Sequence, residues 1–245
     1  MQKRTRRDVI QAIGVALAAS PLGALAGCVG SSSASSSASN PTSPSTPTTG
    51  SSTCVVTAEE TAGPYPDMTG MRGNQAFYRQ DVREGRPGLP LTLTLTIVNT
   101  RNNCAALAGA AVEIWQCDAE GRYSEYAQPG YNGTGQTFLR GLQVSDSGGH
   151  ATFSTIYPGW YSGRATHIHI EVFVNGASVK TTQIAFPESI TRQVYASGVY
   201  AAHGQNSVTN ATDNVFSDGT ATEMATLAGD TTTGYTATLT IGVSV

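Results

Sequence analysis

The sequence predicts an all-β domain: an antiparallel β-sandwich with one short helix and long loops. Residues 91–98, LTLTLTIV, alternate with a period of two, which places leucine on one face and β-branched side chains on the other. Residues 235–243 alternate in the same way. Clusters of turn-forming residues, such as SDSGG at 145–149 and VNGA at 174–177, separate short apolar segments. Only residues 188–201 have a helical pattern, and it is brief.

Further short strands are expected between the first and the last. Each is bounded by Gly, Pro, Asn, Asp or Ser, and no internal repeat interrupts the series. Many short strands with turns between them and almost no helix are typical of sandwiches of the immunoglobulin or transthyretin type. The expected strands are 111–116, 137–144, 150–155, 167–175 and 179–186.

Residues 1–27 are predicted to be an export signal. A basic start leads into a weakly apolar stretch that is interrupted by polar residues and is too short to span a membrane comfortably. The pair Arg6 and Arg7 resembles a twin-arginine signal. Leu-Ala-Gly directly before Cys28 resembles a lipoprotein cleavage site, although ordinary secretory cleavage nearby is the alternative. We therefore expect an exported protein of the cell envelope, periplasmic or on the outer surface, that meets the membrane only through a lipid on Cys28.

Residues 28–53 are rich in Ser, Thr and Pro and are interpreted as a tether, because they have no apolar periodicity with which to form a core. Residues 54–245 are long enough for one globular domain. The chain has 14 basic and 17 acidic side chains, and residues 1–8 hold four of the basic ones and one acid, which leaves 10 and 16. With a net charge of −6 and no basic run, this remainder is not expected to bind nucleic acid.

Three cysteines follow the tether: Cys54, Cys104 and Cys117. Disulfides persist in exported proteins, and three thiols allow one bridge and one free thiol. We predict a bridge between Cys54 and Cys104, since each lies at the edge of an element, with Cys117 buried and free. The sequence does not settle this pairing.

His167 and His169 stand two residues apart in a predicted strand, so both imidazoles point to the same face. Histidine is a common metal ligand, but such a pair in a strand is more often exposed or satisfied by hydrogen bonds. Two tyrosines raise the expectation of a metal site. Tyr123 ends the segment WQCDAEGRY at 115–123, and Tyr161 ends TIYPGWY at 155–161, each after a turn; a half-buried aromatic at a sandwich corner is the ordinary alternative.

These segments resemble the intradiol ring-cleavage dioxygenases, the family of catechol and protocatechuate dioxygenases. The W-Q-x-x-x-x-G-R-Y and P-G-x-Y … R-x-x-H-I-H patterns are the specific ones, and the matching segments cover nearly the whole globular domain in order. They are ETAGPYP (60–66), QDVREGRPGLPLTLTLTI (80–97), GAAVEIWQCDAEGRYS (109–124), FLRGLQVSDSGGHATFSTIYPGWY (138–161), RATHIH (164–169), QIAFPE (183–188) and TDNVFSDG (212–219).

The resemblance implies an enzyme with a non-haem Fe(III) ion. The family's four ligands fall on Tyr123, Tyr161, His167 and His169. The substrate would be a catechol, bound as a dianion, and O₂ would cleave its ring between the two hydroxyl carbons to a muconate-type product. Tyr161 would leave the iron and act as a base, Arg164 would stabilise negative charge on the ring, and Gln183, placed at the start of the next strand, would form a hydrogen bond nearby.

The chain departs from the family between Tyr161 and His167, where only SGRAT is found in place of a longer loop. A shallower and more open site is the expected consequence, and the identity of the catechol and the oligomeric state stay open. Two other functions are considered. One is a non-catalytic, ligand-binding sandwich of transthyretin type tethered to the envelope, and the other is a copper or zinc module that uses the two histidines. The two tyrosines favour the enzyme.

Overall fold

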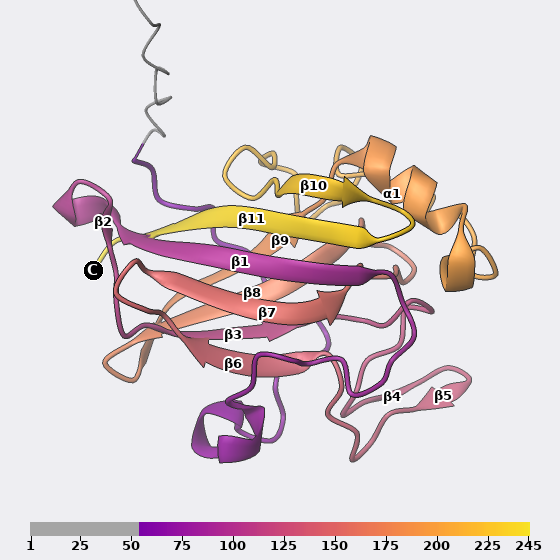
Figure 1. The fold of residues 1–245 in the computed structure, drawn as a ribbon, viewed down its shortest axis with the longest axis horizontal. Coiled ribbons are helices and arrows are strands. Elements are labelled where there is room, and N and C mark those ends of the chain that lie inside the picture. The colour runs from indigo at the N-terminus through magenta and orange to yellow at the C-terminus, as the bar shows by residue number, and fades with distance from the viewer. Residues whose placement is uncertain (1–53) are drawn as a thin grey trace, which may run out of the picture. The chain divides into compact units, whose positions relative to one another are not determined.

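The structure, a computed structural model, describes residues 54–245, so the predicted signal, the tether and Cys28 lie outside the described residues. Two β-sheets form the two layers of a sandwich (Figure 1). The chain runs through β1 (Pro90–Asn99), β2 (Ala105–Ala106), β3 (Ala111–Trp115), β4 (Ala127–Gln128), β5 (Tyr131–Asn132), β6 (Arg140–Val144), β7 (His150–Ile156), β8 (His167–Val174), β9 (Ala177–Ala185), α1 (Glu188–Tyr195), β10 (Thr226–Asp230) and β11 (Gly234–Val243). Short 3-10 turns lie at Met71–Gly73, Gln75–Phe77, Thr100–Asn102 and Gly198–Tyr200.

One sheet has the order β10, β11, β1, and β1 also pairs with β7 and β2. The other has the order β6, β3, β8, β9, and β4 and β5 form a separate two-stranded ribbon. The predicted sandwich is confirmed, and each segment expected from the sequence overlaps the strand or the helix predicted for it. One pair differs from the antiparallel expectation: β1 and β11 run parallel, with Leu91 opposite Tyr235 and Asn99 opposite Val243.

The core lies between the two sheets. In β1 the leucines at 91, 93 and 95 are buried in it, as the period of two predicts. In β8 the residues that face this core are Ile168, Ile170 and Val172. His167 and His169 alternate with them, so their side chains lie on the other face of the four-stranded sheet. They are nevertheless buried, because loops cover that face.

The segment before β1 supplies part of this cover. Thr57 donates its backbone N–H to Gly242 of β11, and Glu60 donates to Thr181 at the edge of β9. Further on, Tyr65 packs against Tyr123 over the outer face of the four-stranded sheet. The N-terminal part of the domain therefore links the edges of both sheets before it reaches the histidines.

The predicted disulfide is confirmed, because Cys54 and Cys104 are bonded. Cys117 is a buried free thiol, as expected. Strand β10 was not expected, because its sequence, TLAGD, lacks alternation and most of its side chains are exposed. Within the described residues no helix has the length and apolar character needed to cross a membrane.

Candidate metal centre

The two histidines of β8 meet at their Nε2 atoms. These nitrogens lie 3.1 Å apart, and the rings are nearly perpendicular, with an interplanar angle of 87°. His169 is opposite Trp115 of β3 and Gln183 of β9 in the sheet register. The Trp115 ring stacks on His169 with 4.9 Å between centroids and 2° between planes, which holds the imidazole in place. The expectation from sequence that both imidazoles point to one spot is therefore met.

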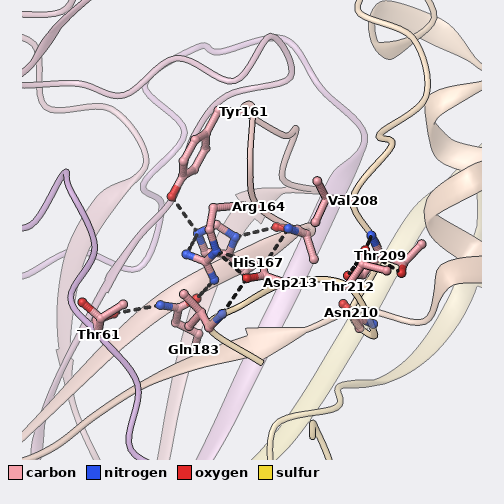
Figure 2. Close-up of polar contacts among 12 residues, drawn as sticks. Thr61, Tyr161, Arg164, His167, Gln183, Val208, Thr209, Asn210, Thr212 and Asp213 are labelled. Carbon is pink, nitrogen blue, oxygen red and sulfur yellow. Dashed lines mark hydrogen bonds and ion pairs between the residues drawn. The ribbon is translucent and has the colours of Figure 1, made fainter. Parts of the chain in front are cut away.

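The two tyrosines reach the same spot from two loops. Tyr161 Oη lies 3.4 Å from His167 Nε2 (Figure 2). The Tyr123 ring lies 5.7 Å from the Tyr161 ring and 6.4 Å from the His169 ring, between centroids. All four expected ligands thus come together, although they derive from two loops and one strand.

The two tyrosine-bearing loops are held together by close backbone contact. Gly121, in the turn before Tyr123, has a φ of +80°, and a Cβ at this position would lie 2.1 Å from the carbonyl oxygen of Trp160. Only glycine allows this approach, because any side chain would collide with a backbone atom. The glycine in W-Q-x-x-x-x-G-R-Y therefore places Tyr123 beside the loop that carries Tyr161.

Burial controls the charge of all four groups. It lowers the pKa of His167 to about 3, with Arg164 contributing in the same direction, and it lowers the pKa of His169 well below its usual range. Both imidazoles are therefore neutral at neutral pH. The Nδ1 of His167 lies 2.6 Å from the carbonyl oxygen of Ala165, which places the proton on Nδ1 and leaves the lone pair on Nε2.

The phenols carry the opposite shift. Burial raises the pKa of Tyr161 to about 12, and Arg164 opposes the shift. Burial raises the pKa of Tyr123 well above its ordinary value, and its hydroxyl is buried without a hydrogen-bond partner among the described residues. Such an orphaned hydroxyl costs about 1–3 kcal/mol. A cation beside it would remove this cost and favour the phenolate.

These observations fit a single metal ion. Two nitrogen ligands at right angles on one ion lie about 3 Å apart when each metal–nitrogen bond is about 2.1 Å, close to the spacing of the two Nε2 atoms. Two phenols and two neutral imidazoles form a mixed set of hard and borderline donors, which suits a ferric ion better than a soft one. Tyr123, Tyr161, His167 and His169 could therefore hold a metal.

Arg164 lies beside this set in a buried network (Figure 2). Its Nε donates to both carboxylate oxygens of Asp213, at 3.0 and 2.9 Å, and its Nη2 donates to Gln183 Oε1 at 2.5 Å. Its Nη1 lies 3.5 Å from His167 Nε2. Gln183 donates in turn to the carbonyl oxygen of Thr61 at 2.8 Å. The guanidinium is thereby aimed at the ligand set.

Two details here differ from the sequence interpretation. Gln183 lies near the end of β9, not at its start, because the strand already begins at Ala177. Asp213 was given no role, although the segment TDNVFSDG was singled out. Its signal was weak, since an Asp in a turn is common, and only the fold brings it to Arg164, 49 residues away.

Tyr65, an aromatic residue of the segment ETAGPYP, was also given no role from the sequence. Tyr65 stacks on Tyr123 with 4.5 Å between centroids and meets Tyr161 edge-on at 5.6 Å. Tyr123, His167 and His169 are buried, whereas Tyr161 and Arg164 are half-buried. The side of the site that carries Tyr161 and Arg164 is thus nearest to solvent. The predicted shallowness of the site stays a prediction.

Comparison with known proteins identifies the family to which this chain belongs. A family model described as "Dioxygenase" matches residues 63–221. An intradiol ring-cleavage dioxygenase from Tetranychus urticae is 28% identical, with a TM-score of 0.70 over 78% of this chain and 95% of that one. The dioxygenase domain of a dioxygenase–carbohydrate-binding protein fusion from Streptomyces sp. SirexAA-E is 26% identical, with a TM-score of 0.57 over 78% and 99%. 3-Chlorocatechol 1,2-dioxygenase from Rhodococcus opacus 1CP, at 19% identity and a TM-score of 0.51 over 76% and 72%, shares the fold.

The match to the family model spans most of the chain, including every residue of the proposed ligand set. The chain therefore belongs to the dioxygenase family. The predicted enzyme class, an intradiol aromatic ring-cleavage dioxygenase, is confirmed.

Proposed function

We propose that this protein is a non-haem Fe(III)-dependent intradiol dioxygenase that opens catechol-type rings between the two hydroxyl carbons, with both atoms of O₂ entering a muconate-type product. The observation that carries this proposal is the meeting of Tyr123, Tyr161, His167 and His169 at one buried point beside a fixed arginine. When bound there, ferric iron would supply Lewis-acid chemistry that binds the catechol as a dianion and activates its ring toward O₂.

The chain's own residues would handle protons and charge. Tyr161 is the half-buried phenol, and its high intrinsic pKa makes its phenolate a strong base toward a catechol hydroxyl. Arg164 would stabilise the negative charge of the substrate, because Asp213 and Gln183 hold its guanidinium in place. Gln183 is itself oriented by the carbonyl oxygen of Thr61. The buried surroundings of His167 strengthen these interactions by excluding water.

The test is spectroscopic first and catalytic second. Protein loaded with ferric iron should absorb visible light, because tyrosinate-to-iron charge transfer colours it. Tyr161→Phe should shift this absorption, and His169→Ala should abolish iron binding. Tyr126→Phe is the matched control, because its ring packs against Tyr65 while its hydroxyl donates to Pro66.

Catechol should then yield an ultraviolet-absorbing product without the yellow colour of an extradiol product. A panel of substituted catechols would define the preferred substrate. A loaded protein that is coloured but inert on the whole panel would refute the catalytic proposal and favour a binding sandwich. Colour unchanged in both Tyr161→Phe and His169→Ala would refute the ligand set.

We also propose that the protein is exported and tethered to the cell envelope through a lipid on Cys28. The proposal rests on the composition of residues 1–28, and the bond between Cys54 and Cys104 supports it, because disulfides persist mainly outside the cytoplasm. Cys28→Ser should release the protein from membranes and abolish incorporation of labelled fatty acid. Equal membrane association of the variant would refute the anchor.

A further inference from the structure

Three carboxylates outside the ligand set meet at the edge of β9. Glu60, Asp218 and Glu223 each offer one oxygen, and these oxygens all lie within 4.8 Å of one another. Glu60 and Glu223 are buried, and Asp218 is exposed. Glu60 belongs to the segment before β1, whereas Asp218 and Glu223 belong to the loop before β10. The fold thus joins acids that lie about 160 residues apart in sequence.

The side chain of Glu223 is a second and independent indication that these acids bind a ligand. Its side chain is fully buried, and one oxygen accepts from Thr182 Oγ1 at 3.2 Å. The other oxygen, Oε2, is buried and has no partner among residues 54–245. An unpaired carboxylate oxygen in the interior costs more than a neutral group does, so a missing partner is indicated.

No cationic side chain that the structure describes provides that partner. Over the described part of the chain, none of the three acids lies within 4.0 Å of a Lys, Arg or His nitrogen. Arg164 is near enough to lower the pKa of Glu60 slightly, but its guanidinium is committed to Asp213. Burial and the neighbouring acids raise the pKa of Glu60 and of Glu223 to about 7. Like charges so close together need a cation or a proton between them.

We propose that Glu60, Asp218 and Glu223 bind a divalent cation of the calcium class, at a site separate from the tyrosine and histidine ligands. Carboxylate oxygens are the ligands of hard cations. Ca²⁺ holds its oxygens at about 2.3–2.6 Å in a flexible arrangement, so that opposite oxygens lie up to about 5 Å apart. Mg²⁺ loses its water ligands reluctantly and is usually bound by only one or two carboxylates, so a cluster of three acids suits it less well. One open side at Asp218 leaves room for water ligands.

The position of the site gives it a structural consequence. The Glu60 N–H donates to Thr181, and the Glu223 carbonyl accepts from Ala185, so the acids clamp the edge of β9 on both sides of Gln183. Asp218 also lies five residues after Asp213, the partner of Arg164. A bound cation would therefore hold the loop that positions Arg164. This consequence rests on the proposed function, whereas binding of the cation does not.

The experiment is calorimetric titration of the chelator-treated full chain with CaCl₂, without added iron and at about pH 7.5. One equivalent should bind, and Ca²⁺ should raise the melting temperature by several degrees. Asp218→Asn should weaken binding by about tenfold or more, and it should fold because the side chain is exposed. Glu223→Gln should do the same. Glu59→Gln is the matched control: Glu59 adjoins Glu60 in sequence but is exposed and pairs with Lys180.

Three results would overturn the proposal. Millimolar Ca²⁺ that produces neither heat nor a melting shift would mean that the acids share a proton. Binding by Asp218→Asn equal to that of the unaltered chain would place the ion elsewhere. Tighter binding of Mg²⁺ than of Ca²⁺ would refute the calcium class. Because none of these readouts uses iron or a catechol, a failure here is distinct from a failure of the proposed ring cleavage.

Discussion

Gly63→Ala should disturb the metal centre through a single methyl group. Gly63 has a φ of +69°, and a Cβ there would lie 2.8 Å from His169 Cε1 and 3.3 Å from its Nε2. Non-bonded carbons prefer about 3.5–4.0 Å, so the imidazole would have to move by about 0.7 Å or more. Its stack on Trp115 resists that movement. Metal–ligand distances tolerate only about 0.2 Å, so iron affinity should fall by about tenfold or more.

Gly70→Ala is the control variant that distinguishes the effect of this contact from the effect of backbone strain. Gly70 has a φ of +77°, and a Cβ there would meet nothing within 4 Å. Each alanine pays about 1–2 kcal/mol for the left-handed conformation, so both variants should lose similar stability in urea unfolding from this cause. Only Gly63→Ala should lose visible absorption when titrated with ferric iron. If Gly63→Ala takes up iron as tightly as Gly70→Ala does, then either His169 is not a ligand or its position is not set by Gly63.

Three other changes are expected to have separate effects. Asp213→Asn should leave iron binding intact but lower the rate of ring cleavage per bound iron by about tenfold to a hundredfold, because Arg164 loses its carboxylate partner; an unchanged kcat would contradict this. At a pH above 7, Glu113→Gln should melt at a higher temperature than the unaltered protein. At pH 4 the two should melt at the same temperature. Burial raises the pKa of Glu113 to about 7 from 4.5, so the folded state is penalised once the group ionises, by up to about 3 kcal/mol; a pH-independent difference would refute this. Replacing Cys54 and Cys104 by Ser should lower the free energy of unfolding by about 2–4 kcal/mol, since the bridge spans 50 residues, and reductant should bring the unaltered protein to the same value. Equal midpoints in urea without reductant would show that the bridge adds nothing.

The sequence by itself determined the features that depend on local periodicity and on short motifs. The alternation in residues 91–98 predicted both the strand and the face of it that is buried, because a period of two assigns side chains to faces without any knowledge of partners. The same rule placed His167 and His169 on one face. Turns marked by glycine and proline predicted the loops that carry Tyr123 and Tyr161. The family motifs then indicated that these four residues converge.

The tertiary structure decided everything that depends on which segments meet across the chain. Alternation reports a buried face but not a partner, so the parallel pairing of β1 with β11 followed from packing and not from either strand's own sequence. In the same way, only the fold brings Asp213 to Arg164 and Glu60 to Glu223. The sequence around an acidic residue does not specify which distant residue it will contact. The cluster of two tyrosines and two histidines and the network that positions Arg164 are therefore products of contacts between residues far apart in sequence. Burial and close packing select these contacts.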